Sequence, residues 1–120
     1  MTVHQQEDGW VLETDHTAYA LGLNSQGMLV HRYWGKRLFG PEDYPPAPHS
    51  EGWASFNGPG QTLPEEYPTY GGLKYIDPCL KVSFADGVRD ADLAFQSASV
   101  SDRDQGEHLV IELHDRAYPL

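Results

Sequence analysis

The 120-residue sequence contains one cysteine, Cys79. A single thiol cannot close a disulfide within the chain, and it cannot supply the paired cysteines of a structural zinc site. The sequence therefore excludes an internal oxidative cross-link and a cysteine-based metal centre. We expect Cys79 to be a buried, unreactive thiol.

Positive charge is also scarce, with 8 Lys and Arg against 18 Asp and Glu and a formal net charge of −10. Such a chain repels phosphate backbones, so we expect no nucleic-acid partner. No apolar run approaches the roughly 18 residues that span a bilayer, and residues 1–8 lack the basic flank and apolar core of a secretory signal. We therefore expect a cytoplasmic protein without a membrane partner.

What is present is a series of short strand-forming runs separated by turn residues. Residues 10–14, 17–23 and 28–34 predict an antiparallel meander, in which Gly27 can supply the positive φ of the second turn. The third run carries large apolar side chains on both alternating faces, so we expect both faces of this sheet to be covered. Tyr33 and Trp34 are expected to be core or domain-interface residues.

The second half of the chain predicts further strands. Residues 80–84 and 92–100 predict a hairpin around Asp86-Gly87, and residues 108–113 predict a strand after the charged turn at 101–106. Residues 117–120 resemble the beginning of one more strand, so the sheet is expected to be cut before its pairing is complete. We predict an all-β fold, an antiparallel β-sandwich in which residues 1–120 form part of a larger domain.

Between these strands, residues 41–78 contain eight prolines and show no helical periodicity. We expect a long irregular segment whose aromatic side chains pack against the rest of the protein. A connection of this length inside a compact domain usually has a function.

Several short motifs, in order, resemble the N-terminal β-sandwich domain of bacterial α-galactosidases of glycoside hydrolase family 36. They are Thr17-Ala18-Tyr19 with Leu21, Gly27 and Leu29 with His31-Arg32-Tyr33-Trp34-Gly35-Lys36, Leu63-Pro64 with Glu66-Tyr67-Pro68-Thr69-Tyr70-Gly71, and Pro78. Two departures favour a divergent subfamily with altered specificity. Lys74-Tyr75-Ile76 replaces the usual Asp-Phe-Arg, and the Gly-Leu-Pro that commonly follows the later hairpin is missing.

The resemblance implies a supersandwich-like domain of a longer enzyme. Its catalytic (β/α)8 barrel, which is not in this sequence, would hydrolyse terminal α-galactosyl residues with retention through two aspartates and without a cofactor. The N-terminal domain would support that barrel, take part in a homo-oligomer, and lend the loop after the Tyr-Trp-Gly strand to a neighbour's galactoside pocket. Here that loop is residues 38–63.

Within this loop we select Asp43, Glu51 and Trp53 as candidate substrate-binding residues. A carboxylate accepts hydrogen bonds from sugar hydroxyls, and an indole face suits the apolar side of galactose. No family residue aligns onto these three positions, so the choice depends on their chemistry.

No residue of this chain is assigned a catalytic or metal-binding role. Glu65 and Glu66 are sequence neighbours whose side chains would diverge, and the six histidines lack the close spacing of a metal site. A second hypothesis is a free-standing carbohydrate-binding β-sandwich module, which requires a platform of surface aromatics. A third is a pure assembly domain, with Trp53 buried and an apolar face exposed.

Overall fold

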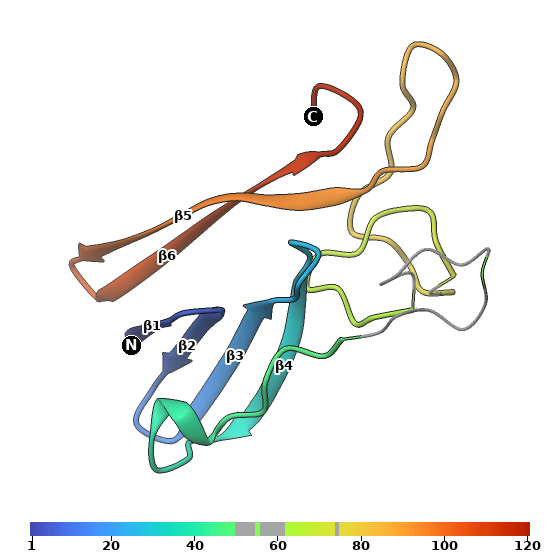
Figure 1. Cartoon of the computed structure of the whole chain (residues 1–120). Coiled ribbons are helices and arrows are strands. Elements are labelled where there is room, and N and C mark those ends of the chain that lie inside the picture. Colours follow the sequence, from blue (N-terminus) through green and yellow to red (C-terminus); the bar gives the residue numbers. More distant parts are fainter. Residues whose placement is uncertain (50–54, 56–61, 74) are drawn as a thin grey trace.

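Two antiparallel sheets form the regular structure in the described part of the chain (Figure 1). The structure is a computed structural model that describes residues 1–49, 55, 62–73 and 75–120. The first sheet has the order β1-β2-β3-β4, with β1 at Thr2–Gln6, β2 at Gly9–Glu13, β3 at Thr17–Leu23 and β4 at Leu29–Lys36. The second is the hairpin of β5, Leu93–Arg103, and β6, Gly106–Asp115. The all-β, antiparallel prediction is confirmed.

The meander closes through turns that the sequence encodes locally. The backbone N–H of Thr14 donates to the carbonyl of Thr17 over 2.9 Å at the first turn. At the second, the Asn24 side-chain oxygen accepts from the N–H groups of Gln26 and Met28, and Gly27 takes a φ of 76°. The three strands predicted at 10–14, 17–23 and 28–34 are therefore confirmed.

Strand β1 was not predicted, because its sequence Thr-Val-His-Gln-Gln is mostly polar. It pairs along its whole length with β2, and it also contacts the second sheet. The N–H of Val3 donates to the Glu107 carboxylate, and the N–H of Glu107 donates to the Met1 carbonyl over 3.2 Å. Its position is therefore set by the neighbouring strand β2 and by Glu107, which is distant in sequence.

A β-bulge interrupts the pairing of β3 with β4. Ala20 pairs with Tyr33 and Leu21 with His31, which leaves Arg32 without a directly opposite residue. Because the bulge adds one residue to β4, the usual alternation shifts there, and His31 and Trp34 share one face of the sheet.

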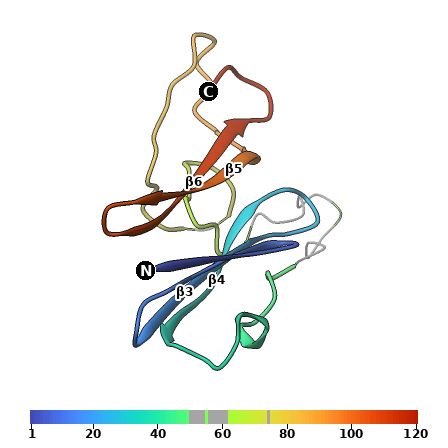
Figure 2. The ribbon, with the colours of Figure 1, turned by 90° about the vertical axis from the view of Figure 1, so that its left-hand side faces the viewer.

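Both faces of the four-stranded sheet are covered, as predicted. The β5–β6 hairpin forms a second layer over one face (Figure 2). There Trp10, Leu21 and Leu29 are buried, and the Phe95 ring lies 5.7 Å from that of Trp10. On the other face, Tyr44 covers a buried cluster of Val11, Ala18 and Ala20.

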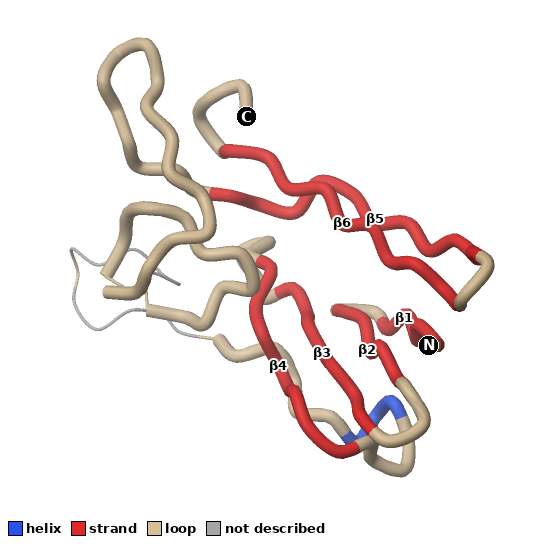
Figure 3. The backbone as a smooth tube through the Cα atoms, turned by 180° about the vertical axis from the view of Figure 1, so that it is seen from behind, coloured by secondary structure: helices blue, strands red, loops and turns tan. Residues whose placement is uncertain are grey.

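The segment between the sheets is irregular wherever it is described, with one 3-10 turn, η1, at Pro41–Asp43 (Figure 3). The strand predicted at 80–84 is wrong, although the turn at 85–87 forms through hydrogen bonds between Phe84 and Val88 and between Gly87 and Phe84. Strand β5 instead pairs with β6, and Phe84 stacks on Tyr118 with ring centroids 3.9 Å apart.

Three further expectations need correction. Residues 117–120 form a turn, because the Asp115 carboxylate accepts from the N–H groups of Ala117 and Tyr118 and the N–H of Asp115 donates to the Leu120 carbonyl. Cys79 is exposed, since it lies in the irregular segment rather than on a covered sheet face. Trp34 is 77% exposed and so is not a core residue. No helix in the described part of the chain has the length and apolar character to cross a bilayer.

Candidate functional site

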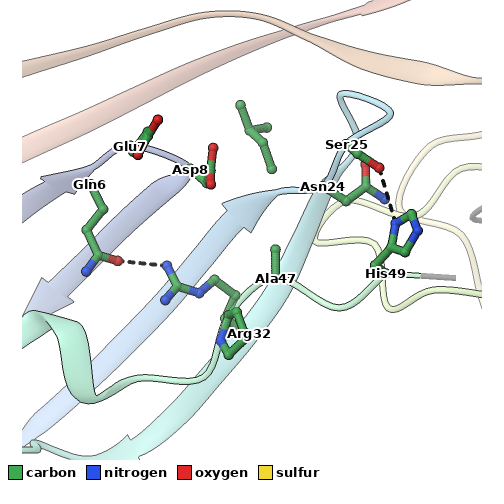
Figure 4. A pocket seen from close by; sticks show the side chains of 10 residues that line it. Gln6, Glu7, Asp8, Asn24, Ser25, Arg32, Ala47 and His49 are labelled. Atoms are coloured by element: carbon green, nitrogen blue, oxygen red, sulfur yellow. Dashed lines mark hydrogen bonds between the residues drawn. The ribbon is translucent and has the colours of Figure 1, made fainter.

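A pocket of about 510 Å³ opens at one end of the four-stranded sheet (Figure 4). The β1–β2 turn with Glu7 and Asp8 lies on one side, and the β3–β4 turn with Asn24 and Ser25 lies on another. Residues 46–49, which precede the undescribed part of the loop, complete the wall. The pocket therefore adjoins the segment that contains the predicted substrate-binding residues.

Arg32 crosses the sheet from the bulge to reach this pocket. Its Nη1 donates to Gln6 Oε1 over 2.8 Å, and its Nε donates to the Pro45 carbonyl over 2.6 Å. A Cβ on Gly22 would lie 2.7 Å from Arg32 Cδ, and one on the paired Gly9 would lie 3.0 Å from Nη1. The two glycines thus leave the space in which the arginine lies.

Burial lowers the pKa of Arg32, and the charge of Asp8 opposes that effect. A guanidinium remains protonated at neutral pH even so. Arg32 therefore places a positive charge between the sheet and the loop, where it binds the loop through main-chain carbonyls.

The opposite wall has a hydroxyl and an imidazole in contact, with Ser25 Oγ and His49 Nδ1 3.2 Å apart (Figure 4). A nucleophilic serine would need its histidine oriented by a third group. In the described part of the chain the hydrogen bonds of His49 include none to a carboxylate. The described residues of the pocket therefore offer a hydroxyl, an imidazole and a guanidinium for binding, without the third group that an acyl-transfer centre needs.

A second anchor of the loop lies on the same face of the sheet. The Tyr44 hydroxyl donates to buried Glu13 Oε1 over 2.9 Å and accepts from the N–H of Leu38. Glu13 Oε2 lies 3.0 Å from His4 Nε2 and 3.2 Å from Arg37 Nε. Burial acts to raise the pKa of Glu13, but the Tyr44 hydroxyl, His4 and Arg37 together hold it below its ordinary value.

Of the three predicted site residues, the structure places Asp43. Its side chain is exposed, and its Oδ2 accepts from the backbone N–H of Gly40 over 2.9 Å, so one carboxylate oxygen serves to cap η1. Glu51 and Trp53 lie outside the described residues.

Sequence reasoning missed the residues that line this pocket. Arg32 had a visible signal, because it is a charged residue within an otherwise apolar strand. Gln6, Ser25 and His49 had none, since only the three-dimensional fold brings the two turns and the loop together. Within the described residues, no group of three or more His, Cys, Asp or Glu side chains is placed to hold a metal ion.

Comparison with known proteins gives a family match over most of the chain. The description "Glycosyl hydrolase family 36 N-terminal domain" matches residues 27–120. A curated protein of Mediterraneibacter gnavus, the bifunctional alpha-galactosidase/sucrose kinase AgaSK, is 30% identical over 99 residues. That alignment covers 76% of this chain and 11% of the longer protein.

Solved structures agree with this match. The galactosidase domain of alpha-galactosidase-sucrose kinase AgaSK superposes with a TM-score of 0.75 at 26% identity, covering 96% of this chain and 19% of that one. Alpha-galactosidases from Lactobacillus brevis and Geobacillus stearothermophilus give TM-scores of 0.74 and 0.72, both at 22% identity, and show the same fold. They cover 95% and 96% of this chain, which spans 19% of each of them.

Proposed function

We propose that this chain, which belongs to the glycosyl hydrolase family 36 N-terminal domain family, is the non-catalytic N-terminal region of an α-galactosidase-type glycoside hydrolase. The observation that carries the proposal is the superposition on a galactosidase domain over 96% of this chain but 19% of that one. In the proposed enzyme a separate barrel cleaves terminal α-galactosyl residues with retention. This region supports the barrel and the oligomer in a cytoplasmic protein.

An apolar hollow between the two layers supports the idea of a partial sandwich. It measures about 510 Å³ and is lined mainly by Leu29, Tyr67, Leu80, Ile111 and Leu113. The second sheet has two strands against four in the first. Further polypeptide seated beside the hairpin would cover these side chains and gain hydrophobic stabilisation.

We further propose that the loop at residues 38–63 contributes to galactoside binding in a neighbouring subunit. Support comes from its two anchors, the Arg32 guanidinium and the Tyr44 hydroxyl, which fix residues 38–45 on the sheet. Glu51 and Trp53 follow this anchored part. Asp43 has one carboxylate oxygen left for a sugar hydroxyl.

The test compares this 120-residue chain with the longest natural product of its gene, using hydrolysis of a p-nitrophenyl α-galactoside. We expect activity in a longer product that contains a barrel and none in this chain. Hydrolysis by this chain would contradict the proposal, and so would a gene that encodes no barrel. In the active protein, Trp53→Ala should raise KM for the galactoside about tenfold, whereas Tyr75→Ala, at an exposed aromatic outside the loop, should not change KM.

A further inference from the structure

An aromatic and polar cluster lies along the edge strand β4. It is on the face of the sheet that the hairpin packs against, and Trp34 stands at the end of that face where β4 finishes. Trp34 is 77% exposed there, whereas Trp10 in the core of the same sheet is 4% exposed. Its directly opposite residue on β3 is Tyr19. An indole with most of its surface in water leaves a large apolar face without a partner.

Polar groups beside Trp34 are held in place by a network that reaches a third segment. The Tyr19 hydroxyl donates to Glu66 Oε1, and His31 Nδ1 lies 3.4 Å from Glu66 Oε2. The Tyr19 and His31 rings meet edge to face at 5.2 Å. This network fixes both rings on the face that Trp34 occupies.

The backbone of residues 64–66 continues the sheet beyond β4 and secures Glu66. The N–H of His31 donates to the Pro64 carbonyl over 2.9 Å, and the N–H of Glu66 donates to the Leu29 carbonyl over 3.0 Å. Burial together with the Glu66 carboxylate raises the pKa of Tyr19, so its phenol remains neutral. The cluster is therefore organised before any ligand arrives.

We propose that Trp34, His31 and Tyr19 form a binding site for a neutral hexopyranoside. The C–H face of a pyranose ring would stack on the Trp34 indole. His31 is 38% exposed in its side chain, and because its Nδ1 faces Glu66, Nε2 is the ring nitrogen left for a hydrogen bond with a sugar hydroxyl. The site has the exposed apolar platform and the fixed polar edge that sugar binding requires.

Charge selects a neutral sugar over an acidic one. The Glu66 carboxylate contributes negative charge beside the platform, and the chain carries a net charge of −10. The arginines nearest along β4 are bound elsewhere, Arg32 to Gln6 and Pro45 and Arg37 to Glu13. Lys36 is exposed two residues after Trp34 on β4, but a single cation does not outweigh the Glu66 carboxylate and the net charge of −10, so a phosphorylated or carboxylated sugar would meet net repulsion.

The experiment titrates the full chain with methyl α-galactoside while the tryptophan indole N–H signals are followed by NMR. We expect a saturable shift of the Trp34 signal with a Kd in the millimolar range. Trp34→Ala should weaken binding at least about tenfold, and His31→Ala several-fold. Tyr75→Ala, which removes an exposed aromatic side chain outside the cluster and outside the loop at residues 38–63, should leave the Kd unchanged. Galactose 6-phosphate should bind more weakly than the neutral sugar.

The inference is overturned if the Trp34 signal does not saturate up to about 100 mM sugar. It is also overturned if glycerol shifts that signal equally, or if Trp34→Ala binds like the original chain. Circular dichroism checks the fold of each variant. If Trp34→Ala does not fold, Trp34→Phe takes its place in the titration; because it keeps a smaller aromatic face, it should bind the sugar more weakly than the original chain but retain part of the affinity. Because the readout is binding and not hydrolysis, its failure would leave the proposed function standing.

Discussion

Glu13 shows how a single buried side chain ties stability to pH. Its pKa lies below the ordinary value in the folded chain, so the unfolded chain takes up protons more readily as the solution is acidified. The pKa of Asp115 is also lowered: burial acts to raise it, but the N–H groups of Ala117, Tyr118 and Asp92 outweigh burial. Both carboxylates therefore stabilise the fold above about pH 4.5, and this contribution is lost as the pH falls further.

Replacing Glu13 by glutamine should therefore have two effects. We expect the free energy of unfolding at pH 7 to fall by about 2 kcal/mol, because His4 and Arg37 lose the buried anion that they contact. Between about pH 5 and pH 3, stability should fall less steeply than in the original chain, because glutamine does not titrate. Urea denaturation across this range measures both effects. Asp104→Asn, at an exposed turn, is the control, and parallel pH profiles for Glu13→Gln and the original chain would contradict the prediction.

At the scale of elements, the β5–β6 hairpin is held on the sheet largely by apolar side chains. Phe95 packs against Trp10, and its backbone N–H donates to the Gly27 carbonyl over 2.9 Å. Phe95→Ala should lower the free energy of unfolding by about 3 kcal/mol through loss of buried surface. Hydrogen exchange should quicken more in β5 and β6 than in β2 and β3. Val100→Ala, at a more exposed position of the same strand, is the matched control, and equal acceleration in both sheets would refute a separately held hairpin.

Strands whose signals are local were predictable, and those that depend on distant partners were not. Residues 17–23 alternate, and the Asn24 to Gly27 turn is encoded by its own residues, so β3 and β4 followed from sequence. Strand β1 is mostly polar, so its sequence does not show its pairing with the neighbouring β2, and its other partner, Glu107, is distant in sequence. Residues 80–84 alternate equally well but form no strand, because β5, their predicted partner, pairs with β6 instead. No local signal in the sequence shows which of two candidate strands β5 will pair with.

The candidate site illustrates the same limit. Asp43 was selected because it is acidic and lies in the proline-rich loop; its part in sugar binding stays a prediction, and its capping of η1 was not foreseen. The pocket residues Arg32, Gln6 and His49 come from a bulge, a strand end and a loop, and their convergence depends on the register of the sheet. The motif around Arg32 identified the family, but its side-chain contacts became visible only in three dimensions.

For the whole molecule, the net charge of −10 works against the compact state. Raising NaCl from about 0.01 M to 0.15 M shortens the Debye length from about 30 Å to about 8 Å and screens this repulsion. We therefore expect the melting temperature at pH 7 to rise by a few degrees. A double variant with Asp102→Asn and Asp104→Asn, both exposed, should respond less to salt. A melting temperature that falls with NaCl would show that attractive ion pairs outweigh the repulsion.

The bond between Val3 and Glu107 joins residues 104 positions apart and has a consequence for synthesis on the ribosome. Strands β1 to β4 emerge well before the hairpin that covers them, so Trp10, Leu21 and Leu29 face the surrounding water during that interval. Contacts of such long sequence separation slow folding, because the intervening chain must be ordered first. We therefore expect the nascent meander to be prone to aggregation until residues 93–115 have left the exit tunnel.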